Sequence, residues 1–454
     1  MKTYEVVVIG AGDVGLGIVF KALSEGYKVA LINRGPVGGT CVNVGCVPSK
    51  TLVYAADRII EILEAGKLGI QADIRGIDFG AIMGWMRSAV TSGRTSLEKA
   101  IRTSENLDFY DEIGHFVEEY TLQVKEEKIR GDKIFIATGS RNFIPPIKGL
   151  ETVGYLTNES VLDLTTRPES LLIIGGGFIA VEYAHFFSAL GTKVAMIERN
   201  RSLIAGTEPE ISALLQRKMG KRMEISTDTE VVEVRRVDGG CAVRMQNRET
   251  GEEREISAER IMVATGRRSN ADWLMPERAG IEVEEKGFIR VDEYLRTNKE
   301  NIWALGDAIG KAMFTHAGDK EAEIAWHNAT HAEKIVMDFE MVPYAVFTQP
   351  QIASVGLTEE QARKTHEVLV GRASYSDTVM GTAMREDEGF AMAVVEKNTR
   401  RILGFHIIGP EAAILIQEVV NAVANNSTVE SITGTMHIFP ALSDLITETL
   451  SNLE

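Results

Sequence analysis

Short apolar runs alternate along the chain with stretches in which apolar residues recur at helical spacing. Residues 4–9 are an apolar run that predicts a buried strand, and the glycine-rich turn Gly10-Ala-Gly12-Asp-Val-Gly15 follows directly. An amphipathic helix to about Gly26 and a second strand over 28–32 come next. This order of strand, glycine turn, helix and strand predicts a βαβ unit.

The same pattern recurs in the middle of the chain. An apolar strand over 170–174 precedes Gly175-Gly-Gly177-Phe-Ile-Ala180, a helix to about 190 and a strand over 193–197. In each copy 23 positions separate the first glycine from the residue that closes the second strand, Asn33 or Glu198. Glycines let the backbone approach a pyrophosphate, and the helix N-terminus supplies N–H groups and a positive dipole. The repeat therefore predicts two dinucleotide sites.

The residues that close the second strands bear on which nucleotides bind. A carboxylate there normally accepts hydrogen bonds from a ribose, as expected of Glu198 with NADH, whereas Asn33 can bond hydroxyls without the charge. Arg199 and Arg201 follow Glu198 and could bind a 2′-phosphate, or could simply be a solvated strand end. The sequence favours NADH narrowly over NADPH at the second site.

The rest of the chain completes a three-domain pattern. Turns at 137–140, 264–267 and 304–307 each end a further apolar strand. From about residue 342 strand candidates at 345–348, 355, 391–396 and 402–408 mix with a helix over 411–425. We therefore predict an α/β fold with two Rossmann-like dinucleotide-binding domains and a C-terminal α+β domain.

Composition narrows the class of protein. The 454 residues are 44% apolar and 25% charged, which excludes disorder. The net charge of −16 and the lack of a basic run disfavour nucleic acid, and no apolar stretch reaches the roughly 18 residues of a membrane span. The start runs into a strand without a cleavable apolar region, and three cysteines are too few for a secreted scaffold, so we expect a cytoplasmic protein.

Two cysteines lie five residues apart in Gly38-Gly39-Thr40-Cys41-Val-Asn-Val-Gly45-Cys46-Val-Pro48-Ser-Lys50. Such a pair could close a small strained disulfide that opens on receiving two electrons. Structural cysteines and metal ligation are the alternatives. A closed metal site usually needs four ligands, and Cys241 lies in a remote charged segment, so we expect no metal. The motif favours a redox role.

These motifs, with Gly306-Asp307 and the segment Val-Phe-Thr-Gln-Pro-Gln-Ile-Ala-Ser-Val-Gly-Leu-Thr over 346–358, resemble the flavin-dependent pyridine nucleotide–disulfide oxidoreductases along essentially the whole chain. That family includes dihydrolipoamide dehydrogenase, mercuric reductase, glutathione reductase and mycothione reductase. The resemblance implies a homodimer with FAD on the first glycine turn and NAD(P)H on the second. It implies a FAD-binding domain over 1–148 and 268–341, an NAD(P)-binding domain over 149–267 and a dimerisation domain over 342–454.

The resemblance also implies a role for individual residues. The residues implied to bind FAD are Gly10, Gly12, Gly15, Asn33, Gly39, Thr40, Lys50, Thr138, Gly139 and Asp307. Those implied to bind NAD(P) are Gly175, Gly177, Phe178, Ala180, Glu198, Arg199 and Gly266. Phe178 would be an aromatic gate that moves when nicotinamide stacks, and Lys50 would pair with Glu182 beside the flavin. Cys46 would be the flavin-facing thiolate and Cys41 the sulfur that exchanges with substrate.

The chain departs from the family pattern near its C-terminus. Disulfide reductases of the family usually carry His-Pro there, with a carboxylate five residues after the histidine, which serves the partner subunit as acid/base. Here Phe439 precedes Pro440, and Asp444 fills the carboxylate position. Because a general acid/base contributes 10²- to 10⁴-fold, we expect impaired turnover of ordinary lipoamide or glutathione-like disulfides. His437 could substitute, but a surface or interface role is the favoured interpretation.

We expect an NAD(P)H-dependent FAD disulfide oxidoreductase of the dihydrolipoamide dehydrogenase type, passing electrons through Cys41–Cys46 to a small disulfide or another acceptor. Phe439 leaves a second chemistry open, because 2-ketopropyl-coenzyme M oxidoreductase/carboxylase also has Phe there, although with His where this chain has Asp444. A mercuric or low-molecular-weight disulfide reductase also stays open, although the tail over 450–454 lacks the cysteine pair of mercuric reductases. Docking to a multienzyme complex is a further alternative. Oxidases and monooxygenases with two Rossmann domains do not share the cysteine pair.

Overall fold

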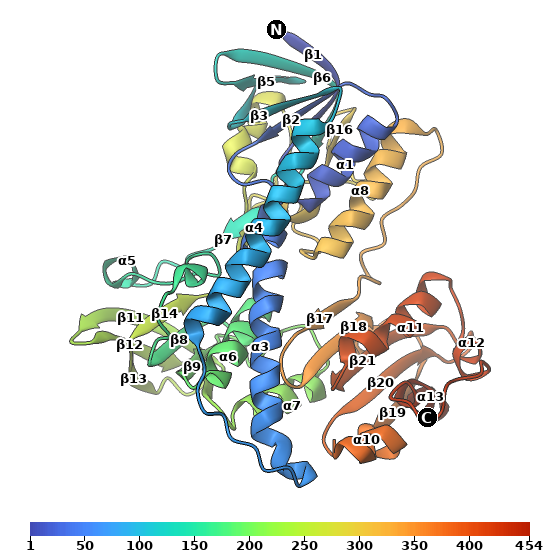
Figure 1. The fold of residues 1–454 in the computed structure, drawn as a ribbon. Coiled ribbons are helices and arrows are strands. Elements are labelled where there is room, and N and C mark those ends of the chain that lie inside the picture. Colours follow the sequence, from blue (N-terminus) through green and yellow to red (C-terminus); the bar gives the residue numbers. More distant parts are fainter. The chain divides into compact units, whose positions relative to one another are not determined.

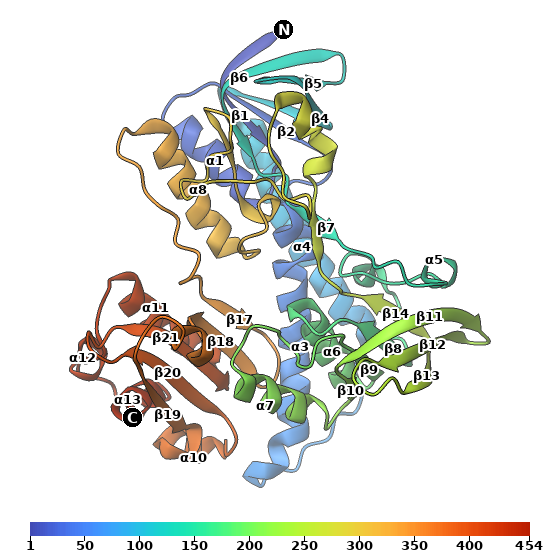
Figure 2. The ribbon, with the colours of Figure 1, turned by 180° about the vertical axis from the view of Figure 1, so that it is seen from behind.

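The computed structural model describes residues 1–454, which divide into two compact units (Figures 1 and 2). Unit 1 comprises Met1–Ser49, Gly84–Phe143 and Gly266–Phe339, and unit 2 comprises Lys50–Met83, Ile144–Thr265 and Glu340–Glu454. Two long helices, α3 (Cys46–Glu64) and α4 (Phe79–Thr103), each begin in one unit and end in the other. None of the helices combines the length and the apolar character that a bilayer-crossing segment requires.

Unit 1 is built on a seven-stranded sheet in the order β3-β2-β1-β6-β5-β4, with β16 paired to β6. Its central strand β1 is parallel to both β2 and β6, and the apolar run over 6–9 is buried, as expected of a parallel strand covered on both faces. A two-stranded ribbon, β7 with β15, belongs to the same unit. The strands of unit 1 are β1 (Lys2–Ile9), β2 (Val29–Asn33), β3 (Leu107–Asp111), β4 (Gly114–Glu118), β5 (Thr121–Val124), β6 (Glu127–Ile136), β7 (Ser140–Asn142), β15 (Arg267–Ser269) and β16 (Ile302–Ala304).

Two helices of unit 1 lie side by side, α1 (Asp13–Ser24) and α8 (Thr315–Thr330), in both ribbon views (Figures 1 and 2). Small residues allow the close packing, because a Cβ built at Gly17 would lie 3.7 Å from the Ala322 Cβ. The strand–turn–helix–strand order expected at the start of the chain is present as β1, α1 and β2.

Unit 2 contains the second copy of this pattern as β8 (Ser170–Ile174), α6 (Phe178–Ala189) and β9 (Lys193–Ile197). The sheet has the order β10-β9-β8-β14 and is parallel throughout. An antiparallel sheet, β11-β12-β13, follows in the chain. The remaining elements of residues 144–265 are α5 (Leu150–Val153), the 3-10 helix η2 (Ser160–Asp163), α7 (Pro209–Met219), β10 (Glu224–Ser226), β11 (Thr229–Val237), β12 (Gly240–Asn247), β13 (Glu253–Ala258) and β14 (Arg260–Val263).

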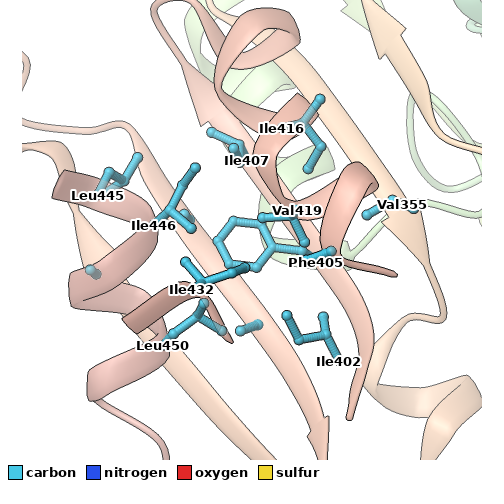
Figure 3. Close-up of a cluster of buried hydrophobic side chains, with 14 of the residues drawn as sticks. Val355, Ile402, Phe405, Ile407, Ile416, Val419, Ile432, Leu445, Ile446 and Leu450 are labelled. Carbon is cyan, nitrogen blue, oxygen red and sulfur yellow. The ribbon is translucent and has the colours of Figure 1, made fainter. Parts of the chain in front are cut away.

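The C-terminal part of unit 2 is an antiparallel five-stranded sheet with helices packed on it. The strand order is β17-β18-β21-β20-β19, and Phe405 of β21 is fully buried beneath side chains of α11, α12 and α13 (Figure 3). Strand β19 and helix α13 were not predicted from the sequence. The elements are β17 (Tyr344–Val346), β18 (Gln351–Gly356), α9 (Glu359–Ala362), β19 (Val368–Ser374), α10 (Val379–Met384), β20 (Phe390–Glu396), β21 (Ile402–Gly409), α11 (Ala412–Ala424), α12 (Val429–Thr433) and α13 (Asp444–Ser451).

One carboxylate of unit 1 lies in the interior. Glu321 of α8 is fully buried, and its Oε2 accepts a hydrogen bond from the Gly306 backbone N–H at 2.5 Å. Its Oε1 has no hydrogen-bond partner. Burial therefore raises the pKa of Glu321 from 4.5 to about 7. The fold tolerates this group because it can remain protonated near neutral pH.

We expect Glu321→Gln to change the pH dependence of stability. The folded state holds a proton on Glu321 that the unfolded chain releases above about pH 4.5, so wild-type stability falls as pH rises from there to about 7. Glutamine does not ionise, so the variant lacks this loss of stability. The melting temperature of the variant minus that of the wild type should therefore increase between about pH 5 and about pH 8. Glu323→Gln on the exposed side of α8 is the control. A constant difference between Glu321→Gln and the wild type at all pH values would contradict the assignment.

Candidate active site

The two nearby cysteines lie on either side of a break between helices. Helix α2 (Gly39–Val44) carries Cys41, Gly45 leaves the helical conformation with φ −126° and ψ −106°, and α3 begins at Cys46. A Cβ at Gly45 would lie 2.8 Å from the Thr40 carbonyl oxygen, so the break needs a glycine. Both cysteines are present as thiols, Cys41 half-buried and Cys46 exposed. The arrangement is a reduced dithiol.

The surroundings of the two sulfurs differ. A hydrogen bond with Cys46, followed by burial, raises the pKa of the Cys41 thiol. The Thr315 hydroxyl, at the first position of helix α8, lies 3.4 Å from the Cys46 Sγ. Cys41 therefore retains its proton, although a hydrogen bond with the Thr315 hydroxyl acts in the opposite direction on its pKa. Cys46 lies beside the same hydroxyl, at the N-terminus of α8. Cys241 is buried, and its thiol donates to the Ala258 carbonyl oxygen at 3.3 Å, so it is not part of this pair.

The cysteine segment is attached directly to the first glycine turn. Gly12 and Gly38 form a bridge, the Gly38 N–H donates to the Ala11 carbonyl oxygen at 2.7 Å, and a Cβ at Gly39 would lie 2.7 Å from the Gly12 Cα. The backbones thus approach more closely than side chains would permit. On the other side, a Cβ at Gly10 would lie 2.2 Å from the Ala137 carbonyl oxygen. The absence of side chains at these glycines therefore lets the turn pack tightly against the cysteine segment on one side and against Ala137 on the other.

The side chain of Asn33, which is expected to bond a ribose, makes hydrogen bonds to backbone groups. Its Oδ1 accepts from the Ala11 N–H at 2.9 Å and its Nδ2 donates to the Gly35 carbonyl oxygen at 2.8 Å. The side chain therefore closes the glycine turn. Its role toward a ribose stays a prediction.

Polar groups gather at the ends of strands β6 and β16. Asp307 accepts a hydrogen bond from the Ser140 hydroxyl at 2.5 Å and lies 3.4 Å from the Arg267 Nε. The Arg267 guanidinium also donates to the Thr40 hydroxyl at 3.5 Å. The Thr138 Oγ1 is buried without a hydrogen-bond partner. These groups, together with Gly139 in a left-handed conformation with open space where a Cβ would stand, fit a bound flavin nucleotide.

The second glycine turn has the same construction within unit 2. A Cβ at Gly175 would lie 2.3 Å from the Ala264 carbonyl oxygen, whereas one at Gly177 would meet nothing within 4 Å. Glu198 is buried, its Oε1 accepts from the Asn200 N–H at 2.6 Å, and its Oε2 would lie 2.8 Å from a Cβ at Gly176. The carboxylate is thus held against the turn, while Arg199 is exposed. This geometry fits a dinucleotide whose ribose carries free hydroxyls.

Lys50 and Glu182 form an ion pair in unit 2. The Lys50 Nζ lies 2.7 Å from the Glu182 Oε2, and the Glu182 Oε1 accepts from the Phe347 N–H at 3.1 Å. The Lys50 Nζ also lies 4.7 Å from the centre of the Phe347 ring. Lys50 follows Cys46 by one turn of α3. The predicted pairing of Lys50 and Glu182 is therefore present in the structure.

Phe178, the predicted gate, begins helix α6 and packs edge-on against Tyr344, with ring centres 5.4 Å apart. Gly266 has a φ of +122° with open space at the Cβ position, and Ala180 is fully buried in α6. The roles of these three residues toward a nicotinamide nucleotide stay predictions.

The C-terminal segment offers no free imidazole. Phe439 is 73% exposed, and the Asp444 carboxylate accepts from the Ala441 N–H at 3.2 Å. His437 Nε2 lies 2.7 Å from the Glu418 Oε1, and its Nδ1 lies 2.9 Å from the Thr435 carbonyl oxygen. Both partners are acceptors, so an imidazole that makes both bonds is doubly protonated, and the Glu418 hydrogen bond raises the pKa of His437. This pairing ties His437 to its own domain.

A dithiol mounted on a nucleotide-binding turn, in a chain with a second such turn, is the arrangement of a flavin- and nicotinamide-dependent oxidoreductase. The chain belongs to the pyridine nucleotide-disulphide oxidoreductase family. The family's main model matches residues 4–329, and the model of its dimerisation domain matches residues 342–450.

Similar proteins agree with this assignment. Mycothione reductase of Mycobacterium tuberculosis is 35% identical over 100% of both chains. Dihydrolipoyl dehydrogenase 3 of Haloarcula marismortui is 32% identical over 99% of this chain and 96% of that protein. The Cu(II) complex of the HOCl-induced flavoprotein disulfide reductase RclA from Escherichia coli superposes with a TM-score of 0.88 at 28% identity, covering 99% of each chain.

The comparisons confirm the expected family, the mixed α/β fold and the class of enzyme, an oxidoreductase acting on sulfur groups. They also confirm FAD and NAD(P)H as the cofactors of the family. The bounds of the predicted domain segments and the roles of single residues stay predictions. Sequence reasoning missed Thr315, Ser140, Arg267 and Phe347. Ser140 and Arg267 directly follow Gly139 and Gly266, which is the one sequence signal that could have marked them.

Thr315→Val should make the thiolate of the reduced pair harder to form. The substitution removes the hydroxyl group and keeps the shape of the side chain. A hydrogen bond to a charged group such as a thiolate contributes roughly 1.5–3 kcal/mol. We therefore expect the pH at which the reduced enzyme develops thiolate absorbance to rise by about one to two units. Thr330→Val at the other end of α8 is the matched control. An unchanged pH midpoint would show that the Thr315 hydroxyl does not stabilise the thiolate.

Proposed function

We propose that this chain is an NADH-preferring flavoprotein disulfide reductase that works as a homodimer and delivers electrons through Cys41 and Cys46. The observation that carries the proposal is the attachment of the cysteine segment to the first glycine turn, where Gly39 lies against Gly12. The dimerisation-domain match supports the homodimer. The few cysteines support action in the cytoplasm, where thiols are kept reduced. Membership of a larger complex stays open.

Two parts of the chain would hold the cofactors. Gly10, Gly12 and Gly15 would cradle the FAD pyrophosphate, with Gly39, Thr40, Thr138, Gly139 and Asp307 along the rest of the molecule. Gly175, Gly177 and Ala180 would receive the nicotinamide nucleotide, with Glu198 on its ribose. Bound FAD supplies a two-electron relay between nicotinamide and the cysteine pair. The buried Glu198 carboxylate repels a 2′-phosphate, which supports NADH over NADPH.

The protein's own residues divide the remaining work. Lys50, oriented by Glu182, would place positive charge where reduction builds negative charge. Phe178 would cover the nicotinamide site until the nucleotide displaces it. When a Cys41–Cys46 disulfide accepts two electrons, its S–S bond breaks, Cys41 takes a proton and Cys46 remains a thiolate beside Thr315. Cys41 would then pass its proton to the hydrogen-bonded Cys46 thiolate and attack the acceptor as the thiolate.

The acceptor is the open part of the function. Reduction of an ordinary disulfide releases a thiolate that a general acid usually protonates. Phe439 has no proton to donate, and both ring protons of His437 are already held by Glu418 and by the Thr435 carbonyl oxygen. We propose a small disulfide with a good leaving thiolate, or an acceptor that needs no proton. The names of the relatives suggest mycothiol disulfide, lipoamide, Hg(II) and Cu(II) as probes. Phe439 favours dithiol chemistry on carbon, as in a carboxylase, as the second candidate.

The cysteine assignment is tested by anaerobic titration of the purified holoenzyme with NADH and with NADPH. NADH should produce a long-wavelength thiolate-to-flavin absorbance band more rapidly than NADPH. Cys46→Ser should abolish the band because it removes the thiolate, whereas Cys41→Ser should retain it. Cys241→Ser, which changes a buried thiol outside the pair, is the control. A band that survives in Cys46→Ser would reverse the assignment.

The role of Phe439 is tested with the same probes under steady-state turnover. Restoring an acid/base by Phe439→His should raise NADH-dependent reduction of lipoamide or mycothiol disulfide by roughly tenfold or more. Phe439→Leu, which is apolar like the native residue, should leave the rate close to wild type. Fast wild-type turnover that Phe439→His does not improve would show that the enzyme supplies its proton from another group.

A further inference from the structure

A second polar cluster lies in the interior of unit 2 and is not used by the proposed mechanism. His185 of α6 is fully buried, and its Nε2 lies 2.8 Å from the Asp57 Oδ1 of α3. Both terminal nitrogens of Arg222, in the turn between α7 and β10, lie 3.2 Å from the His185 Nδ1. The Arg222 guanidinium also donates to the Gln349 carbonyl oxygen at 3.4 Å.

The partners determine the protonation of the ring. A guanidinium has only donors, so the His185 Nδ1 must accept and carry no proton. The Nε2 must then carry the proton and donate it to Asp57. Burial lowers the pKa of His185, which agrees with a neutral imidazole. The neutral ring therefore connects the cation Arg222 to the anion Asp57.

This cluster joins the same three segments as the Lys50–Glu182 ion pair. The ion pair links Lys50 of α3, Glu182 of α6 and the backbone of Phe347. The buried cluster links α3, α6 and the backbone two residues further on, at Gln349. Glu182 and His185 are three residues apart on α6 and so lie on one face of that helix. Two sets of polar contacts, the ion pair and the buried cluster, thus connect α3, α6 and the segment over 347–349. The orientation of Lys50 depends on these three segments.

Packing alone does not require such a cluster. Burying charged and polar groups costs free energy that an apolar side chain of similar volume would avoid. Apart from Glu182 and Tyr183, the other buried residues of helix α6 are apolar, with Ala184, Phe186 and Phe187 next to His185 in the sequence. The cluster instead fixes how α3, α6 and the segment over 347–349 are oriented relative to one another, because hydrogen bonds depend on direction and apolar contacts do not.

We propose that His185, with Asp57 and Arg222, is a positioning residue that holds the Lys50–Glu182 pair in the orientation that stabilises the reduced flavin. The inference rests on the proposed function, because it assigns a consequence to the charge of Lys50. Loss of the neutral bridge leaves Arg222 and Asp57 without their shared partner and frees α6 to shift against α3. Lys50 then loses the orientation that Glu182 gives its charge.

The test is the midpoint potential of the bound flavin, measured by dithionite titration against a reference dye on the purified holoenzyme. His185→Leu should shift the flavin reduction equilibrium by roughly tenfold toward the oxidised form, which corresponds to about 30 mV for a two-electron couple. His185→Gln, which is neutral and both donates and accepts, should restore the potential to within about threefold of wild type. Tyr375→Phe removes a different buried hydrogen bond, to Pro410, and controls for general destabilisation.

A double-mutant cycle separates positioning from a merely structural role. In a Lys50→Met background, His185→Leu should shift the potential by less than about threefold, because the charge that it orients is gone. An equal shift with and without Lys50 would overturn the proposal, as would an unchanged potential in His185→Leu. If that variant does not fold, Asp57→Leu with Asp57→Asn as its conservative partner gives the same comparison. Protein that binds no FAD would instead refute the proposed function, so the two failures are distinguishable.

Discussion

The close approach of two backbone segments, the first glycine turn and the stretch that leads into the cysteines, determines where the chemistry of this protein takes place. Gly12 and Gly38 are bridged, and Gly39 leaves no room for a Cβ against Gly12. An ordinary side chain at these positions would push the segments apart. The dithiol is therefore attached to the first glycine turn, and the break at Gly45 brings the second cysteine to the start of α3.

The ionisable side chains of the candidate site differ in their burial and in their hydrogen-bond partners. Cys41 is kept protonated by Cys46 and by its burial, while Cys46 lies beside a hydroxyl at the start of a long helix. In unit 2 the Lys50–Glu182 pair is supported by the Phe347 backbone and by a second layer of buried polar groups. The C-terminal segment contrasts with this order, since Phe439 is exposed and His437 is bound by Glu418. The cysteine pair thus has a hydroxyl beside it, whereas both ring nitrogens of His437 are already hydrogen-bonded.

Features that depend on a local pattern of residues could be predicted from the sequence. The two strand–glycine–helix–strand units and the cysteine pair have fixed spacings, so the order of residues alone predicts them. Contacts between distant segments had no such signal: Thr315 is 269 residues from Cys46, and Asp57 is 128 residues from His185. Strand β19 was missed because Gly371 and Arg372 interrupt its apolar pattern, and helix α13 because its apolar face is short. The sequence did not indicate that the Asn33 amide closes the glycine turn, and the role of Asn33 toward a ribose stays a prediction.

The central claim is that a flavin and the Cys41–Cys46 pair form one redox unit. Counting reducing equivalents tests it most directly, because each centre stores two electrons. Anaerobic dithionite titration of the oxidised holoenzyme should consume about four electrons per bound FAD, and a variant in which both cysteines are replaced by serine should consume about two. A wild-type enzyme that is fully reduced by about two electrons per FAD would contradict the account.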